Sequence, residues 1–229
     1  MADRLGNLPL LYQPGRKWVY SVSTDVLGHI VAKASGQGFD EFLQLRFFEP
    51  LGMEDTGFMV PFDKVARFSA NYGSRDGRLM VIDSPNKSKY LKAPKMPSGG
   101  GGLVSTTRDY LRFLQMIQNG GQFEGKRYLK PDSVKLMTTN QLPKEIPFIG
   151  VGDKRPGVGF GLGFSVRIGD SEFDAGARLG EYGWGGAAST HYWCSPKDDL
   201  VVVTMEQTMP YSFDLEFALK KPIYDAIVR

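Results

Sequence analysis

The stretch Glu181-Tyr-Gly-Trp-Gly-Gly-Ala-Ala-Ser189 is the part of the sequence on which our interpretation of the fold depends. It places two adjacent glycines after a tryptophan and leads through small residues into Thr190-His-Tyr-Trp193. Glycine and alanine allow another group to approach the backbone of a strand closely. The stretch is therefore either a strand edge at which a backbone N–H stabilises a reacting carbonyl, or a glycine-rich turn that enters a strand.

The residues around this stretch have the pattern of an antiparallel meander. Phe160–Ile168 alternates in polarity, which predicts one strand, and Ala187–Cys194 predicts a second. Leu200–Met205 is an apolar third strand, which follows the turn signal Pro196-Lys-Asp-Asp199. Because the connection between the second and third strands is short, we expect them to pair antiparallel.

Two helices are predicted before this region. The first begins with Ser23 or Thr24 as its cap, carries apolar residues at helical spacing, and ends with Gly36 just beyond its last turn. The second extends from Phe39 to Phe48, and Pro50 is expected to stop it.

Further along the chain, two more helix starts are recognisable. Ser105 or Thr106, with Asp109 behind it, resembles a capping box, and the helix that it opens is expected to end at Gly120-Gly121. Pro131 begins another short helix. The glycine-rich loop before Ser105 lacks the lysine and hydroxyl that a phosphate-binding loop needs at the start of its helix, so we expect no phosphate site there.

The order of these elements predicts an α+β fold. A mainly helical region with long loops covers residues 1–147, and an antiparallel sheet covers 148–229. Leu215–Ile227 is a closing helix, which Pro222 must kink or split. We expect the two regions to form one compact unit.

Composition and charge limit the classes of partner. With 229 residues, 41% of them apolar, the chain has enough apolar material for a core. A net charge of +3 with scattered basic residues gives no nucleic-acid motif, and no apolar run reaches the roughly 20 residues of a membrane span. Cys194 is the only cysteine, and His29 and His191 lack a zinc spacing, so we expect no disulfide, metal or other cofactor.

Five segments together resemble one known family. They are Gln13–Val22, Asp25–Gly28, Phe48–Met53, Ser98–Thr106 and Gly183–Gly186. In this order and at these separations they are similar to the serine β-lactamase-related proteins, that is, class C β-lactamases and penicillin-binding-protein-like serine hydrolases, and most similar to the esterase-like branch. The resemblance extends from about Leu11 to Met209 and implies a β-lactamase/transpeptidase-like fold.

The resemblance also implies roles for four residues. Family members use a Ser-x-x-Lys helix for the nucleophile, a Tyr-x-Asn loop to shuttle protons, and a Lys-Thr-Gly-like strand that contributes to the oxyanion hole. By this carry-over Tyr20 is the general base, Trp184 and Gly186 line the acyl site, and the Ala187 N–H is an oxyanion donor. Val22 stands where asparagine is usual, and Trp184 stands where lysine would be; both differences favour ester substrates over lactams.

The nucleophile motif has no match in the expected place. In the family it lies upstream of the tyrosine loop, but residues 1–19 contain no serine. The literal match Ser84-Pro-Asn-Lys87 lies downstream of Tyr20, and its proline and asparagine predict a turn rather than a helix. We therefore expect an N-terminally truncated version of the fold that lacks the nucleophile and its lysine.

Two hypotheses of function follow from this difference. In the first, the chain is part of a serine hydrolase that cleaves esters, or lactams, through an acyl-enzyme when complete. In the second, it is a non-catalytic pseudo-hydrolase that acts as a binding or assembly module. An in-frame Ser-x-x-Lys upstream of Met1 in the gene would favour the first hypothesis, and a stop codon there would favour the second.

The expected partners follow from the same reasoning. A small ester or lactam is the expected ligand. Loss of the N-terminal strands would leave Leu200–Met205 as an open apolar edge, so we expect a homo-oligomer or another chain that supplies the missing strands. Residues 1–6 do not have the pattern of a signal peptide, which implies a cytoplasmic location if Met1 is the true start and otherwise leaves the compartment undecided.

The aromatic and histidine residues also have a purely structural interpretation. Tyr20 is then a buried tyrosine with a satisfied hydroxyl, and Trp184 is a core or interface aromatic. Trp18 and Trp193 are expected in the core, and His191 is expected to be a packed strand residue, since the family gives it no role.

Overall fold

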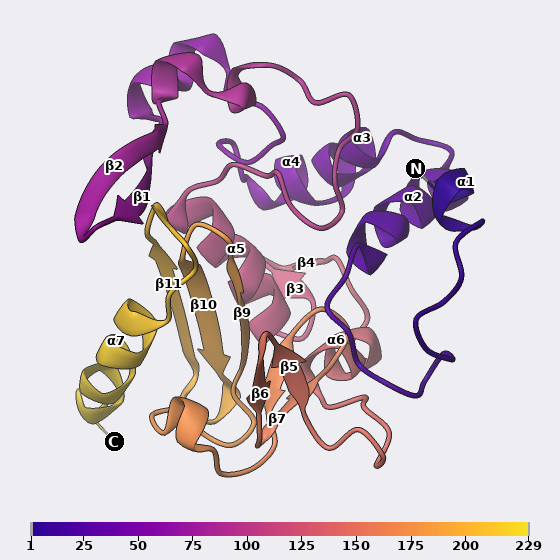
Figure 1. Cartoon of the computed structure of the whole chain (residues 1–229), viewed down its shortest axis with the longest axis vertical. Coiled ribbons are helices and arrows are strands. Elements are labelled where there is room, and N and C mark those ends of the chain that lie inside the picture. Colours follow the sequence, from indigo (N-terminus) through magenta and orange to yellow (C-terminus); the bar gives the residue numbers. More distant parts are fainter. Residues whose placement is uncertain (1, 229) are drawn as a thin grey trace.

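A five-stranded antiparallel sheet organises the computed structural model, which describes residues 2–228 (Figure 1). The strand order is β11-β10-β9-β8-β7. The strands are β7 (Val158–Phe160), β8 (Ser165–Arg167), β9 (Tyr182–Gly186), β10 (Thr190–Ser195) and β11 (Leu200–Met205). All four pairings are antiparallel between strands that are consecutive in sequence, so the meander expected for the C-terminal half is confirmed.

Helices cover both faces of this sheet, α5 (Thr107–Gln118) on one and α7 (Asp214–Asp225) on the other (Figure 1). The alternation of side chains along β10 shows this directly. The Tyr192 ring lies 5.2 Å from that of Tyr110 in α5, whereas the next residue, Trp193, has the Lys220 ammonium of α7 5.4 Å from its ring. The main core lies between the sheet and α5, where Leu114 is fully buried.

The remaining elements surround this layered unit. The helices are α1 (Ala2–Leu5), α2 (Ser23–Ser35), α3 (Phe39–Leu43), α4 (Glu49–Leu51) and α6 (Pro131–Thr138). A smaller sheet has the order β12-β1-β2, from β1 (Asn71–Arg75), β2 (Arg78–Asp83) and β12 (Thr208–Met209). Two short pairs are β3 (Gln122–Phe123) with β4 (Lys126–Arg127), and β5 (Ile149–Val151) with β6 (Asp153–Arg155). The helices and strands together confirm the α+β prediction.

The prediction of one strand over Phe160–Ile168 is wrong, because the chain reverses inside it. β7 ends at Phe160, and β8 begins at Ser165 and pairs back onto it. Gly163 has a φ of 102°, which an L residue rarely adopts. A Cβ at Gly161 would lie 1.9 Å from the Met137 carbonyl oxygen, so the contact with the end of α6 also requires glycine.

The prediction of a strand over Ala187–Cys194 places its start too early. Residues 187–189 form the turn between β9 and β10, closed by the hydrogen bond from Ser189 N to Gly186 O at 2.9 Å. Ser189 has a φ of 61°, the left-handed residue typical of a three-residue hairpin loop. The two glycines after Trp184 are thus the end of strand β9.

The first predicted helix is confirmed as α2, with Gly36 in the left-handed conformation after it. The predicted cap is wrong, since the N-cap is Val22, which makes no side-chain cap hydrogen bond, and the preceding Ser21 hydroxyl accepts from the Ser23 N–H at 3.2 Å. Pro50 does not stop the second helix. A π-helical turn over Gln44–Phe48 leads into α4, where proline occupies the first turn and needs no N–H partner.

The later helix starts are confirmed. The Thr106 hydroxyl caps α5 by accepting from the Asp109 N–H at 3.2 Å, and Pro131 is the first residue of α6. The closing helix is also present, and it is not split, because α7 continues through Pro222 to Asp225. Since that proline lies in the last turn, only one hydrogen bond of the helix is lost.

Candidate functional site

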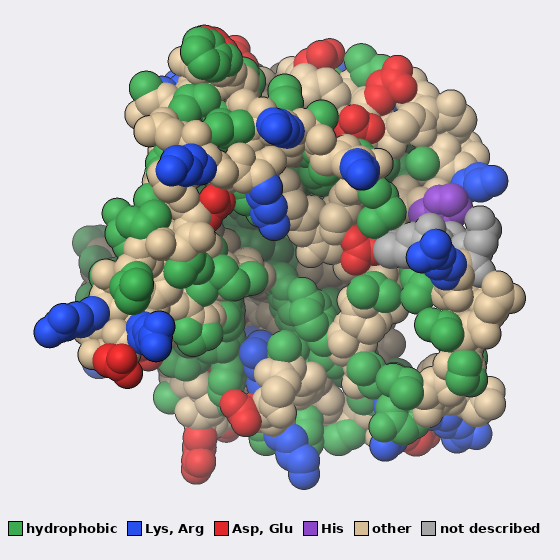
Figure 2. All heavy atoms as spheres, turned by 45° about the horizontal axis from the view of Figure 1, so that its top comes forward, with side chains coloured by type: hydrophobic (Ala, Val, Ile, Leu, Met, Phe, Trp, Pro, Cys, Tyr) green, Lys and Arg blue, Asp and Glu red, His purple; other side chains and the backbone are tan. Residues whose placement is uncertain are grey.

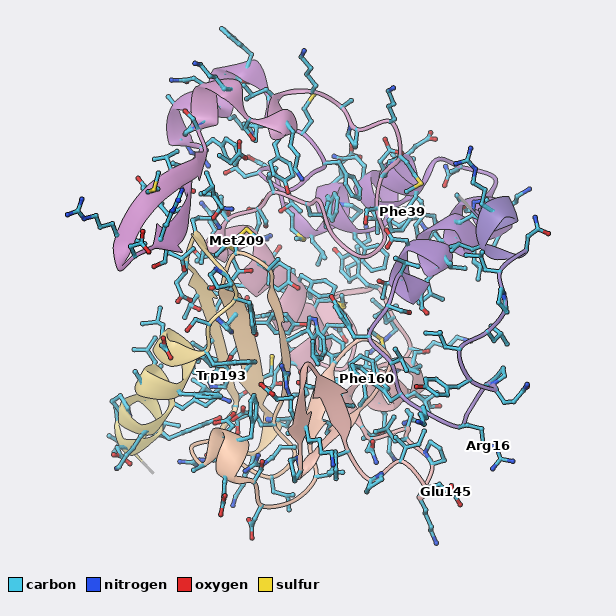
Figure 3. The ribbon with its side chains drawn as sticks, viewed as in Figure 1. Arg16, Phe39, Glu145, Phe160, Trp193 and Met209 are labelled. Carbon is cyan, nitrogen blue, oxygen red and sulfur yellow. The ribbon has the colours of Figure 1, made fainter. Side chains whose placement is uncertain are left out.

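Four aromatic rings hold the segment around Tyr20 against the sheet. The Tyr20 ring lies 5.7 Å from that of Trp184 in β9, and Trp184 in turn lies 5.4 Å from Phe160 in β7. Trp18 completes the group, 5.1 Å from Phe160 and 6.4 Å from Trp184 (Phe160 is labelled in Figure 3). Offset and edge-to-face ring pairs at such distances are stabilising. The structure thus brings together two of the residues expected in the site, although they are 164 positions apart in sequence.

All four expected site residues line one cleft. It has a volume of about 1020 Å³, and Tyr20, Trp184, Gly186 and Ala187 contribute to its wall. The glycine-rich loop at residues 98–102 lines it as well. Figure 2 shows the molecule hollowed near its centre, with hydrophobic side chains gathered around the hollow. Ligand sites are commonly concave and mostly apolar, so this cleft is the candidate site.

Phe39 and Met209 mark the extent of the cleft. Both residues line it, and Figure 3 shows that they come from the helical region and from the region above the sheet, respectively. The cleft therefore lies between the helical region and the turn end of the β9–β10 hairpin. It lies where two parts of the fold meet, as many ligand sites do.

The backbone N–H of Ala187 is unpaired at the rim of the cleft within the described residues. Ala187 is the first residue of the β9–β10 turn, and its side chain is exposed. Within the described part of the chain, no backbone or side-chain acceptor binds its N–H, whereas the neighbouring Ala188 carbonyl accepts from Thr208 N at 3.1 Å. An unoccupied N–H at the rim of the cleft is available to a developing negative charge.

Tyr20 is neither buried nor hydrogen-bonded as the structural interpretation expected. Its side chain is 54% exposed, and no partner for its hydroxyl occurs among residues 4–228. Of the three serines in the cleft wall, Ser98 donates to Asp25 and Ser105 pairs with Thr56 at 2.8 Å, while Ser69 makes no hydrogen bond to the Tyr20 hydroxyl. Nothing in the described structure therefore places a serine and a lysine at the Tyr20 hydroxyl.

Two further serines, Ser84 and Ser189, could be considered as nucleophiles, but both belong to turns of the backbone. Ser84 precedes a short 3-10 turn over Pro85–Lys87, as the sequence predicts. Ser189 is fully buried, donates to the Thr208 carbonyl at 2.9 Å and accepts from Ser212 N at 3.1 Å. Its hydroxyl fixes the turn that carries Ala187, so it positions the site without entering it.

Gly185 is required by a neighbour that the sequence did not indicate. A Cβ at this position would lie 2.3 Å from the Tyr211 hydroxyl, so that hydroxyl rests directly on the backbone of β9. The Tyr211 hydroxyl also lies 3.2 Å from His191 Nδ1, on the neighbouring strand β10. Glycine is therefore needed here for internal packing, and not only for access by a ligand.

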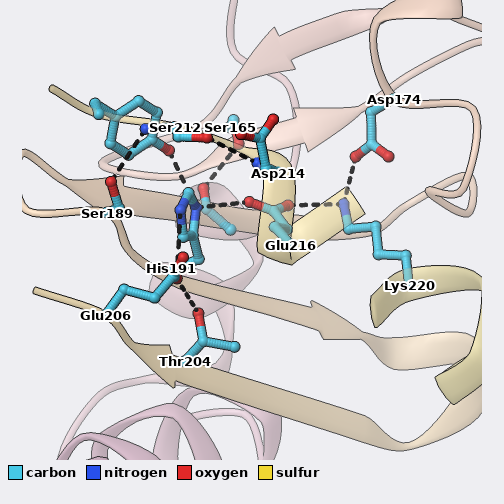
Figure 4. A network of polar contacts seen from close by, with 12 residues as sticks. Ser165, Asp174, Ser189, His191, Thr204, Glu206, Ser212, Asp214, Glu216 and Lys220 are labelled. Carbon is cyan, nitrogen blue, oxygen red and sulfur yellow. Dashed lines mark hydrogen bonds and ion pairs between the residues drawn. The ribbon is translucent and has the colours of Figure 1, made fainter. Parts of the chain in front are cut away.

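A buried polar network continues from Tyr211 into α7 (Figure 4). His191 Nδ1 lies 2.8 Å from Glu216, whose other oxygen lies 2.9 Å from Lys220 Nζ. Burial raises the pKa of Glu216, but His191 and Lys220 outweigh it and leave that pKa below its usual value. Burial and Glu216 raise the pKa of Tyr211 well above its usual value, so its phenol stays protonated.

Three carboxylates surround Lys220, and among the described residues this group most resembles a metal-binding site. Asp174, Glu181 and Glu216 each have an oxygen within 4.8 Å of the others. The Lys220 ammonium contacts all three of these carboxylates and already neutralises part of their charge. The cluster is thus an internal ion-pair network with its own cation.

Sequence reasoning missed this network and recognised only one of its members. His191 was interpreted correctly as a packed strand residue, since it is 1% exposed, and Trp193 is equally buried. Trp18 is only half-buried and belongs to the ring cluster beside the cleft. The one available signal was Lys220, a charged residue on the apolar side of the closing helix, four residues after Glu216.

The comparisons with known proteins agree with this architecture. The family model described as Beta-lactamase matches residues 1–220. Protein Rv1367c of Mycobacterium tuberculosis is 36% identical over 216 residues, which cover 90% of this chain and 52% of that protein. The lovastatin esterase of Penicillium rubens is 28% identical over 247 residues, which cover 100% of this chain and 60% of the esterase.

A solved structure extends the agreement to three dimensions. The simvastatin synthase LovD6 mutant from Aspergillus terreus superposes with a TM-score of 0.79 at 26% identity, over 98% of this chain and 59% of that one. The chain thus spans about half the length of the curated relatives that it matches. Within residues 2–228, no helix is long and apolar enough to cross a membrane.

Proposed function

The chain belongs to the beta-lactamase family, and from this premise we propose that it carries one wall of an esterase-like acyl-transfer site. It has the fold of the β-lactamase and penicillin-binding-protein-like serine hydrolases, and esterases are among its relatives. In the complete site, a serine and a lysine supplied from outside these residues would complete the cleft. The single observation that supports this proposal best is the cleft itself, where Tyr20, Trp184 and the Ala187 N–H converge and no serine of residues 4–228 reaches the Tyr20 hydroxyl.

The residues present suit definite steps of ester cleavage. Tyr20 would take the proton of the attacking hydroxyl and pass it to the departing alcohol. The Ala187 N–H would stabilise the oxyanion of the tetrahedral intermediate, and Trp184 would cover the acyl group. Water would then release the acid from the acyl-enzyme. A free tyrosine has a pKa near 10, so this role requires a cation that lowers it, such as the family's lysine.

The test is reconstitution of esterase activity. We expect that the purified chain alone does not accelerate the hydrolysis of a short-chain p-nitrophenyl ester above the background rate without protein. Co-expression with the part of the Mycobacterium tuberculosis relative that lies outside the match should accelerate hydrolysis, and Tyr20→Phe should lower that rate by about 100-fold or more. Tyr12→Phe is the matched control, since Tyr12 is an exposed tyrosine of the same segment whose ring lies under the Lys17 ammonium and does not line the cleft.

One result would contradict the proposal. Turnover by the chain alone that disappears in Tyr20→Phe would mean that the nucleophile lies within these 229 residues. Ser84, Ser98 and Ser189 would then be replaced first.

A non-catalytic binding or assembly module is the second candidate. The exposed Tyr20 hydroxyl favours it, because that hydroxyl has no hydrogen-bond or ion-pair partner within residues 4–228. A complemented protein that folds, binds an ester and never turns it over would support this module over the esterase.

We also propose that β11 takes a further strand from another copy or another chain. β11 is the last strand of its sheet within the described residues, and its side chains are only partly buried. An open apolar edge tends to pair with another chain. A penicillin-binding-protein homologue from Pyrococcus abyssi that shares the fold is described as octameric.

A further inference from the structure

A second and smaller cavity lies beside the candidate site, next to α7. It has a volume of about 260 Å³, and Tyr20, Trp184 and Ala187 line both it and the larger cleft. The rest of its wall includes Phe173, Phe213 and Arg155, together with the Lys220 network, whose ammonium pairs with the carboxylates of Asp174, Glu181 and Glu216. The two cavities therefore meet at the end of β9, and a ligand held in the small cavity would lie next to the expected reaction centre.

Arg155 is an unusual cation in this wall. It is the last residue of β6, and its guanidinium stacks between the Phe173 and Phe213 rings, 4.8 Å and 4.9 Å from their centroids. Within residues 4–228 its side chain makes no ion pair or hydrogen bond, and its Nε is completely buried without a partner. Burial lowers the pKa of Arg155 from its usual value, as expected for a charge that water solvates poorly.

The carboxylates around Arg155 do not neutralise it. Glu216 is close enough to favour its charge but is bound to His191 at 2.8 Å and to Lys220 at 2.9 Å. Asp153, two residues earlier on the same strand, is exposed. By contrast, Arg178 and Arg112, which are similarly half-buried, each bind a carboxylate of the protein. Arg155 thus keeps its donors available on the side of the cavity.

We propose that this cavity binds the carboxylate of a small apolar ligand, with Arg155 as its partner. A guanidinium presents donors in a planar fork that matches the two oxygens of a carboxylate, and a charge-assisted pair of this kind is strong. The rings of Phe173, Phe213 and Trp184 would hold the apolar body of the ligand. The volume suits a compact acid with one ring or a short chain, since ordinary ligand pockets begin near 300 Å³.

This inference deepens the proposed function and rests on it in one respect. If the chain is part of an esterase, the carboxylate belongs to the acyl or alcohol arm of an ester that carries a second, free acid group. Binding itself needs no catalysis, and therefore the isolated chain can be tested.

The probes are phenylacetate and its neutral isostere phenylacetamide, titrated into the folded chain while the tryptophan indole N–H signals are followed by NMR. We expect phenylacetate to saturate and to bind at least about tenfold more tightly than phenylacetamide, since a hydrogen bond to a charged group contributes that much. Arg155→Met should remove this tenfold preference. Arg75→Met, a matched change at an 80% exposed arginine of β1, should leave it unchanged.

Three results would overturn the inference: equal affinity for the two probes, an unchanged preference in Arg155→Met, or no saturable binding of phenylacetate. If Arg155→Met fails to fold, the wild-type chain still decides the question. Added salt should then reduce the preference for phenylacetate, because screening weakens a charge pair, and a preference that salt does not change would exclude Arg155 as the partner.

The failure of this inference is distinguishable from failure of the proposed function. If the reconstituted protein hydrolyses neutral esters and the chain ignores phenylacetate, the esterase proposal stands and the acid subsite does not. If phenylacetate binds through Arg155 and no reconstituted protein turns over an ester, the subsite stands and the esterase proposal does not.

Discussion

Gly185 shows at the scale of one residue how closely the candidate site is joined to the interior. The residue lies between Trp184 and Gly186 on β9, and both of these line the cleft. Its own missing side chain is the space that the Tyr211 hydroxyl occupies. A glycine that suggests access for a ligand is thus explained by a contact within the protein, and the wall of the site depends on the packing behind it.

The first prediction concerns this contact. Gly185→Ala should destabilise the protein by about 1–3 kcal/mol, because the new Cβ would clash with the Tyr211 ring and hydroxyl. Urea denaturation measures the change in the free energy of unfolding. Gly101→Ala is the control in the same cleft, where a Cβ meets no atom within 4 Å, and it should be neutral or slightly stabilising. Equal stability of the two variants would contradict the assignment of Tyr211 to this position.

The second prediction concerns Asp55, which pairs with two cations of the short 3-10 helix Phe62–Arg67. Its pairs with Arg67 and with Lys64 at 2.8 Å lower its pKa from 3.8 to about 2. Because the pKa is lower in the folded state, the pairs stabilise the protein above about pH 4, and this stabilisation disappears as the pH falls toward 2. The effect should be below about 1 kcal/mol, since Arg67 is 60% exposed and water screens the pair.

Thermal unfolding from pH 7 to pH 2 measures it. Asp55→Asn should be less stable than the wild type at neutral pH, and the difference should vanish near pH 2. Asp76→Asn, at a carboxylate that is 93% exposed, should show no such trend. A constant difference at every pH would mean that Asp55 acts through its shape and not through its charge.

At the scale of the element, α7 is attached to the sheet by charge as well as by apolar packing. Lys220 is 1% exposed and contacts three carboxylates, one from its own helix and two from the loops before β9. Tyr224, one turn later, donates to Glu181 as well. An amphipathic helix usually turns its charged residues toward water, so this helix carries an additional constraint on its position.

The third prediction compares two adjacent lysines of this helix. Lys220→Met should destabilise the protein by about 3–5 kcal/mol, because it leaves Asp174, Glu181 and Glu216 buried without their cation. Lys221→Met should change the stability by less than about 0.5 kcal/mol, since Lys221 is 80% exposed and pairs only with Asp225. Guanidinium denaturation measures the free energy of unfolding of both variants. Similar losses of stability in the two would refute the claim that the Lys220 ion pairs attach α7 to the sheet.

At the scale of the whole molecule, the site lies where the two halves of the chain meet. The sheet and its two helices form a layered body, α3, α4 and the β1–β2 hairpin lie above it, and the cleft of about 1020 Å³ lies where the two parts meet (Figure 1). β11 ends the sheet on the side away from β7. The chain spans about half of the length of the curated relatives that it matches.

The fourth prediction is that the purified chain self-associates through β11. Sedimentation across a concentration series should show a dimer or a larger species. Val201 and Val203 pack against the core, so Val202 lies on the other face of the strand, and Val202→Lys should weaken association by at least about tenfold. Leu79→Lys, on the exposed hairpin of β1 and β2, is the control. A chain that stays monomeric at all concentrations with this edge in solvent would contradict the prediction.

The sequence determined those features that depend on neighbours along the chain. The cap at Thr106, the left-handed Gly36, the helix start at Pro131 and the strand Leu200–Met205 all follow from local conformational preferences, and each is present as expected. The motifs also identified the family, because their order along the chain carries that information without any geometry.

Only the tertiary structure decided which residues surround the site. It divided Phe160–Ile168 into a hairpin through the contact of Gly161 with Met137, and it assigned the space at Gly185 to Tyr211. Likewise, it placed Arg155 in the wall of a cavity and Lys220 in the interior. No periodicity in the sequence predicts such contacts, because they join segments tens of residues apart. A charged side chain can be buried only when folding places partners or a cavity beside it, and that depends on the tertiary structure.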